Sequence, residues 1–105
     1  MDRIRYISVP LNNEGLEEYN EGLEESKNIK IFELMEKDFN ELYSKGIFDK
    51  INNGCRLLID DYESEEIKGQ NLKIALDISK KNKCEVLIQA LELAIERNTL
   101  VALDF

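Results

Sequence analysis

The sequence predicts an α+β fold dominated by helices, with four to five helices and a small antiparallel pairing of N- and C-terminal strands. Apolar residues recur at three- and four-residue spacing through the middle of the chain, which is typical of helices with one buried face. Short stretches rich in β-branched residues lie near both ends. Only one proline and five glycines occur in 105 residues, so we expect a single domain over residues 1–105.

Residues 3–11 are predicted to form the first strand, because apolar side chains alternate along them and Pro10 closes the run. The two sides of this strand carry Ile4 and Tyr6, and opposite them Ile7 and Val9. Residues 99–105 have a similar composition and are the expected partner strand. Two strands alone are only marginally stable, so helices must cover them.

Residues 14–27 contain a seven-residue repeat, Glu-Gly-Leu-Glu-Glu-Tyr-Asn followed by Glu-Gly-Leu-Glu-Glu-Ser-Lys. The period places three apolar residues on one helical stripe: Leu16, Tyr19 and Leu23. The glycine in each copy weakens such a helix by about 1 kcal/mol relative to alanine. The segment is therefore either a solvated, partly frayed acidic helix or an acidic arm that helps to engage a cationic surface.

From Asn28 onward the pattern predicts one helix that ends before Gly46. Its apolar positions recur at three and four: Phe32, Met35, Phe39 and Leu42. Asn28 can cap the start, and Gly46 suits the left-handed conformation that often follows a helix.

Residues 48–62 carry a second helical stripe of apolar side chains: Phe48, Ile51, Cys55, Leu58 and Tyr62. The dipeptide Asn53-Gly54 is also a strong hairpin signal, and in that alternative residues 55–60 form a strand. We prefer the helix because the stripe continues through Gly54 without a break.

Residues 64–69 are expected to form a polar connection. Helical spacing of apolar residues then predicts two further helices, at residues 70–81 and 84–97, with Asn98 as a C-terminal cap.

The chain is acidic, with 22 Asp and Glu against 14 Lys and Arg and a formal net charge of −8. Nucleic-acid backbones and anionic membranes repel such a surface, so we expect neither as a partner. A basic protein partner would be attracted and steered toward it, although an acidic surface can also serve solubility alone.

No signal peptide or membrane-spanning stretch is evident in the sequence, which favours the cytoplasm. Cys55 and Cys84 both lie on apolar helical faces, and we expect them to be buried free thiols in a reducing compartment.

Catalysis and cofactor binding find little support in the sequence. The chain has no histidine, no pair of cysteines at metal-binding spacing and no glycine-rich phosphate loop. Asp49 and Asp60 fall on the first and last positions of a calcium-binding loop, but Ile51 stands where an oxygen ligand is needed. We therefore predict no enzyme activity, no metal and no cofactor.

The candidate binding residues surround one tyrosine. A tyrosine buries a large area at low entropic cost, and neighbouring carboxylates can pair with Arg and Lys of a partner. Alternatively, Tyr62 completes the core stripe and the carboxylates only solvate a helix end. The expected contact residues are Asp60, Asp61, Tyr62, Glu63 and Glu66. Secondary contacts are expected from the acidic repeat, at Glu17, Glu18, Glu24 and Glu25.

Three segments, residues 46–52, 55–63 and 90–105, resemble small bacterial immunity proteins encoded beside polymorphic toxins of the contact-dependent growth inhibition type. The resemblance covers roughly the C-terminal 60 residues. It implies that the protein binds and occludes a cognate basic toxin domain, of which a nuclease is the expected kind, and carries out no chemistry itself. The other class that we consider is a non-catalytic structural or regulatory interaction module, either monomeric or homodimeric.

Overall fold

The computed structural model describes residues 3–23 and 25–105 and has the α+β fold that the sequence predicts. The strands are β1 (Arg5–Pro10), β2 (Ile29–Leu34), β3 (Ser64–Lys68) and β4 (Leu100–Asp104). The helices are α1 (Asn13–Asn20), α2 (Glu36–Ser44), α3 (Ile47–Cys55), α4 (Asn71–Lys81) and α5 (Glu85–Arg97).

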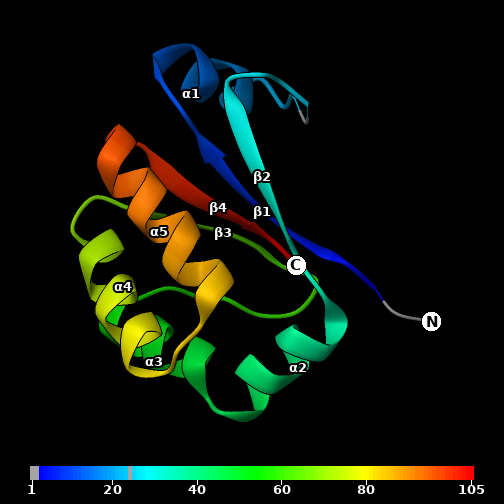
Figure 1. The fold of residues 1–105 in the computed structure, drawn as a ribbon, viewed down its shortest axis with the longest axis vertical. Helices are drawn as coiled ribbons and strands as arrows, with labels where there is room; N and C mark the ends of the chain where they lie inside the picture. Colours follow the sequence, from blue (N-terminus) through cyan, green and yellow to red (C-terminus); the bar gives the residue numbers. More distant parts are fainter. Residues whose placement is uncertain (1–2, 24) are drawn as a thin grey trace.

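The four strands form one antiparallel sheet in the order β2-β1-β4-β3 (Figure 1). The predicted pairing of N- and C-terminal strands is confirmed, because β1 pairs with β4 in the register that sets Ile7 beside Leu103. These two strands occupy the centre of the sheet, and β2 and β3 form its edges.

Helices α3, α4 and α5 lie on one side of the sheet, so its two faces have different surroundings (Figure 1). Helix α5 packs against β1, β2 and β4, while α4 packs on α5 and α3 packs on α4. Side chains that point toward these helices, such as Ile7, Val101 and Ile67, are completely buried. The opposite face carries Tyr6, Ser8, Ile31, Glu33, Ala102, Asp104 and Glu66. We call it the open face.

A buried arginine sits at the end of the core. Arg5 is only 3% exposed, and its guanidinium carbon lies 3.7 Å from the centre of the Phe39 ring. The guanidinium forms ion pairs with Asp61 at 3.1 Å and with Glu36 at 3.7 Å. Because a buried charge is stable only when it is paired, these carboxylates belong to the fold itself.

The single helix predicted from Asn28 to Gly46 is wrong, because the segment forms β2, one further extended residue at Met35 and then α2. Asn28 caps no helix, since its side chain donates to Glu18 at 2.8 Å beside the β1–β2 connection. Ile29, Ile31 and Phe32 are β-branched or aromatic residues that also favour a strand, and pairing with β1 decides between the two readings. The left-handed conformation at Gly46 (φ 72°) is confirmed.

Neither alternative for residues 48–62 is correct. Helix α3 runs through Gly54 but ends at Cys55, because Arg56 turns into the left-handed region with φ 57°. The Asn52 side chain then fixes the returning loop, accepting from the Ile59 N–H at 2.7 Å and donating to its carbonyl at 3.0 Å. No hairpin forms at Asn53-Gly54.

Two smaller corrections concern neighbouring segments. Residues 64–69 are not merely a connection, because Ser64–Lys68 forms the edge strand β3. Only the first copy of the acidic repeat is helical, since α1 ends at Asn20 and the chain turns through Gly22 with φ 85°. Leu23 therefore leaves the predicted stripe and is exposed.

The remaining predictions for the C-terminal half are confirmed. Helices α4 and α5 match the expected boundaries within one residue, and Asn98 adopts the left-handed capping conformation with φ 56°. Cys55 and Cys84 are free and buried.

Candidate protein-binding site

A groove of about 760 Å³ crosses the open face of the sheet. It is bounded at one end by α1 and the segment that follows it, and side chains of all four strands or their flanks contribute to it. Its lining residues are Tyr6, Ser8, Tyr19, Gly22, Leu23, Glu25, Ile29, Ile31, Glu33, Ser64, Ala102, Leu103 and Asp104.

The groove exposes apolar side chains to solvent. Leu23, Tyr6 and Ile31 are 47%, 43% and 37% exposed, and they come from three different segments of the chain. Contiguous exposed apolar surface of this kind is typical of binding sites. A sheet face that is covered only at one end, by α1, therefore provides the strongest candidate interface.

Among the described residues, the charged side chains that line the groove are all acidic. Glu25, Glu33 and Asp104 line it, and no Lys or Arg is among its lining residues. Carboxylates around an apolar floor favour a partner that presents Lys or Arg next to apolar groups.

Tyr19 joins the two acidic segments that the sequence singles out. Its hydroxyl donates a 2.6 Å hydrogen bond to Glu66, so α1 is attached to β3 across the open face. Burial of Tyr19, together with the Glu66 carboxylate, raises the pKa of this phenol well above its usual value. The Tyr19 hydroxyl therefore keeps its proton near neutral pH and is the donor in this hydrogen bond.

The predicted contact residues of the 60–66 cluster have different surroundings. Asp60 is exposed and accepts a hydrogen bond from the Tyr43 hydroxyl at 3.1 Å, which raises the pKa of Tyr43. Tyr62 is 79% exposed and does not complete a core stripe. The Arg3 guanidinium lies 4.3 Å from the centre of its ring. Glu63 is exposed directly before Ser64, which lines the groove.

Asp61 is 30% exposed, but both of its carboxylate oxygens are bound by arginines of the same chain rather than free for a partner. Its carboxylate accepts from the guanidinium groups of both Arg3 and Arg5. Burial favours the neutral form of Asp61, but the hydrogen bond and charge of Arg5, with the charge of Arg3, outweigh it and lower the pKa. Asp61 therefore shapes the loop beside Tyr62 and has little capacity left for a partner.

The secondary contact residues predicted on the acidic repeat also have different surroundings. Glu18 accepts hydrogen bonds from Asn28 and Ser26, which lower its pKa and hold the end of α1 against the chain before β2. Glu17 is exposed, and Glu25 lines the groove. Glu24 lies outside the described residues.

Sequence reasoning missed most of the groove. Tyr6 and Ala102 were assigned to the correct strands, but nothing local shows that helices leave most of this side of the sheet uncovered. Ile31 and Glu33 were missed because residues 29–34 were assigned to a helix, and the β-branched and aromatic residues Ile29, Ile31 and Phe32 were the available signal.

A smaller hollow of about 190 Å³ lies beside the α3–β3 loop, between Tyr43, Asn52 and Asp60. Leu58, which is 81% exposed, forms part of its rim. Within residues 3–23 and 25–105, no group of three or more Cys, Asp or Glu side chains is arranged to hold a metal ion.

Over the same described residues, none of the helices combines the length and apolar character needed to cross a bilayer. Comparison of the chain with protein families, curated proteins and solved structures found no match.

Proposed function

We propose that this protein is an acidic inhibitor of the immunity type, which binds a basic toxin domain in the cytoplasm and blocks it without chemistry of its own. The groove on the open face is the observation that carries this proposal. It combines an apolar floor with the carboxylates Glu25, Glu33 and Asp104 and has no basic residue in its lining.

The mechanism follows from charge and shape. A domain that acts on nucleic acid needs a basic surface to hold phosphates. An acidic protein with a net charge of −8 is steered toward that surface, and the groove then covers it against substrate. Tyr62 and Glu63, exposed beside the Ser64 end of the groove, extend the contact area.

The cytoplasmic location is supported by cysteine chemistry. Both cysteines are buried free thiols, and burial raises the pKa of each, which keeps them protonated and unreactive.

The product of the adjacent gene is the natural probe, and binding can be measured by calorimetry at about 0.15 M salt. The double variant Glu25→Lys/Asp104→Lys should weaken binding by about tenfold or more, because it places cations against a basic partner. The matched control, Asp77→Lys/Glu96→Lys, makes the same change in net charge at exposed positions of α4 and α5. If both double variants lose the same amount of binding affinity, the groove is not the binding surface. If the wild type does not bind or inhibit that product, the proposed function is wrong.

A further inference from the structure

Three side chains from neighbouring strands form a row across the open face of the sheet. Tyr6 of β1 pairs with Glu33 of β2 on one side and with Asp104 of β4 on the other. Directly paired residues place their side chains on the same face of a sheet, so the tyrosine stands between two carboxylates. All three residues are exposed and line the groove, and Tyr6 is 43% exposed.

The strand register also gives the spacing of this row. The Leu11 N–H donates to the Asn28 carbonyl, which marks these two residues as a hydrogen-bonded pair. By alternation, Tyr6 and Glu33 are a non-hydrogen-bonded pair, with Cα atoms about 4.5 Å apart. Toward β4, Tyr6 and Asp104 are a hydrogen-bonded pair, with Cα atoms about 5.5 Å apart. The two acidic residues therefore lie about 10 Å apart along the backbone row, with the ring between them.

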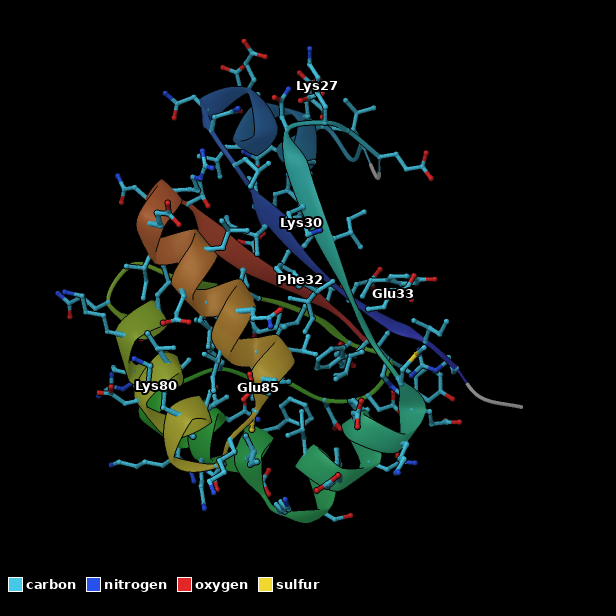
Figure 2. All side chains as sticks on the ribbon, in the orientation of Figure 1. Lys27, Lys30, Phe32, Glu33, Lys80 and Glu85 are labelled. Carbon is cyan, nitrogen blue, oxygen red and sulfur yellow. The ribbon has the colours of Figure 1, made fainter. Side chains whose placement is uncertain are left out.

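The two carboxylates of the row are not engaged within the chain. Over the part of the chain that the structure describes, neither Glu33 nor Asp104 takes part in an ion pair. Lys30 belongs to the same strand as Glu33 (Figure 2), but it pairs with the buried Val9 and therefore lies on the helix side of the sheet. Both carboxylates are thus available to a cation from outside.

Small residues next to the row leave room beside the Tyr6 ring. Ser8 and Ala102 follow Tyr6 and precede Asp104 on the open face, pair with each other and line the groove. Ile31 stands opposite Ser8 and adds exposed apolar surface. The methylene groups of a long cationic side chain can lie on such a floor while its charged end reaches the carboxylates.

We propose that the groove receives one arginine side chain of the basic partner, with its guanidinium stacked on the Tyr6 ring and donating to Glu33 and Asp104. This inference rests on the proposed function for its partner and adds which side chain that partner inserts. Charge complementarity selects a cation, because the described charged residues of the lining are all acidic. Arginine suits the row better than lysine does. Its planar guanidinium stacks on aromatic faces and holds five donors in a rigid fork that can serve carboxylates on two sides, whereas an ammonium is a compact point charge.

Short capped alanine peptides with one central test residue probe the site without the toxin. In amide NMR titrations of the full chain at about 0.15 M salt, the arginine peptide should cause saturable shifts at Tyr6, Glu33 and Asp104. The lysine peptide should bind more weakly. The citrulline peptide keeps the shape of arginine without its charge and should cause no saturable shift.

Substitutions in the row should change the affinity for the arginine peptide in a defined order. Tyr6→Leu should weaken binding about two- to fivefold, as expected for a cation–π contact at a partly exposed ring, whereas Tyr6→Phe keeps the ring and should bind like the wild type. Glu33→Gln and Asp104→Asn should each weaken binding about twofold or more. Asp77→Asn and Glu96→Gln neutralise exposed carboxylates of α4 and α5 and should leave binding unchanged. Circular dichroism would verify that each variant is folded.

Equal affinities for the arginine, lysine and citrulline peptides overturn the proposal, and so do equal effects of the row and control variants. The product of the adjacent gene separates this inference from the proposed function. If it binds the wild type, Tyr6→Leu and Glu33→Gln equally well, the arginine site is wrong and the inhibitory function stands. If it does not bind the wild type, the proposed function is wrong, and the peptide titrations alone decide on the arginine site.

Discussion

The Tyr19 hydroxyl donates a 2.6 Å hydrogen bond to the Glu66 carboxylate, which connects residues 47 positions apart. The bond holds α1 over one end of the open face and thereby gives the groove its boundary.

Tyr19→Phe should lower the free energy of unfolding by about 1 kcal/mol, because a half-buried hydrogen bond to a charged acceptor is lost. Urea unfolding measures this change. Tyr43→Phe is the matched control, since Tyr43 also donates to a carboxylate, that of Asp60, but is exposed. We expect little change in the control. Equal effects in the two variants would mean that the Tyr19 bond has no special role in attaching α1.

Arg5→Ala should destabilise the fold by about 2–3 kcal/mol, because it leaves Asp61 and Glu36 without their buried partner and removes the contact with Phe39. Thermal or urea unfolding provides the measurement. Arg3→Ala removes a half-exposed guanidinium from the same Asp61 carboxylate and should change stability by no more than about 0.5–1 kcal/mol. A larger loss from Arg3→Ala would contradict the assignment of Arg5 as the structural partner.

Asp61 should make stability depend on pH in the acid range. Its pKa is lowered in the folded protein, so its contribution is fully present above the unfolded value of about 3.9 and is lost as pH falls through the folded pKa. The difference in free energy of unfolding between the wild type and Asp61→Asn should therefore be constant near neutral pH and shrink below about pH 4. A difference that stays constant to the lowest pH at which the protein folds would contradict this contribution.

Gly15→Ala should destabilise the protein by about 1–3 kcal/mol, because its new Cβ would lie 2.2 Å from the Asn28 carbonyl oxygen. That oxygen accepts from the Leu11 N–H and has little freedom to move. Hydrogen exchange should show α1 opening more readily than the rest of the chain. Asn20→Ala, at an exposed position of the same helix, is the control and should leave exchange in α1 nearly unchanged.

The elements that could be predicted from sequence are those whose signal is local. Helices α4 and α5 carry uninterrupted apolar stripes, and Asn98 ends the second one with a left-handed cap. The alternation along β1 likewise identifies a strand. In each case the neighbouring residues all favour the same secondary structure, so tertiary contacts are not needed to determine it.

Residues 28–62 were predicted less well because a helical spacing of apolar residues there runs across the ends of helices and strands. Phe32 and Met35 fit a helical stripe with Phe39, yet Phe32 belongs to a strand and Met35 is an exposed, extended residue before α2. Leu58 and Tyr62 continue the α3 stripe in sequence only, because Arg56 ends the helix and both side chains reach solvent. Pairing with β1 makes residues 29–34 a strand, and the hydrogen bonds of Asn52 to Ile59 hold the loop after α3. Neither interaction can be read from the neighbouring residues in the sequence.

The negative charge of the candidate site could be predicted from the sequence, but its position could not. Glu25 and Tyr19 lie in the acidic repeat, but the groove also requires Tyr6, Ile31 and Asp104, which come together only when four strands form a sheet. Asp60 and Asp61 cannot be distinguished in the sequence. The structure shows that Asp61 pairs with the buried Arg5 and therefore stabilises the fold.

The order of the strands also constrains when the molecule can fold during synthesis. Strand β4 lies between β1 and β3, so β3 has no neighbour in the sheet until residues 100–104 have left the ribosome. Before that point β1 can pair with β2 and α5 can pack on them, but β3 cannot join the sheet. A chain that stops before residue 100 would therefore leave β3 unpaired and one edge of β1 exposed, and both segments would be sensitive to proteases.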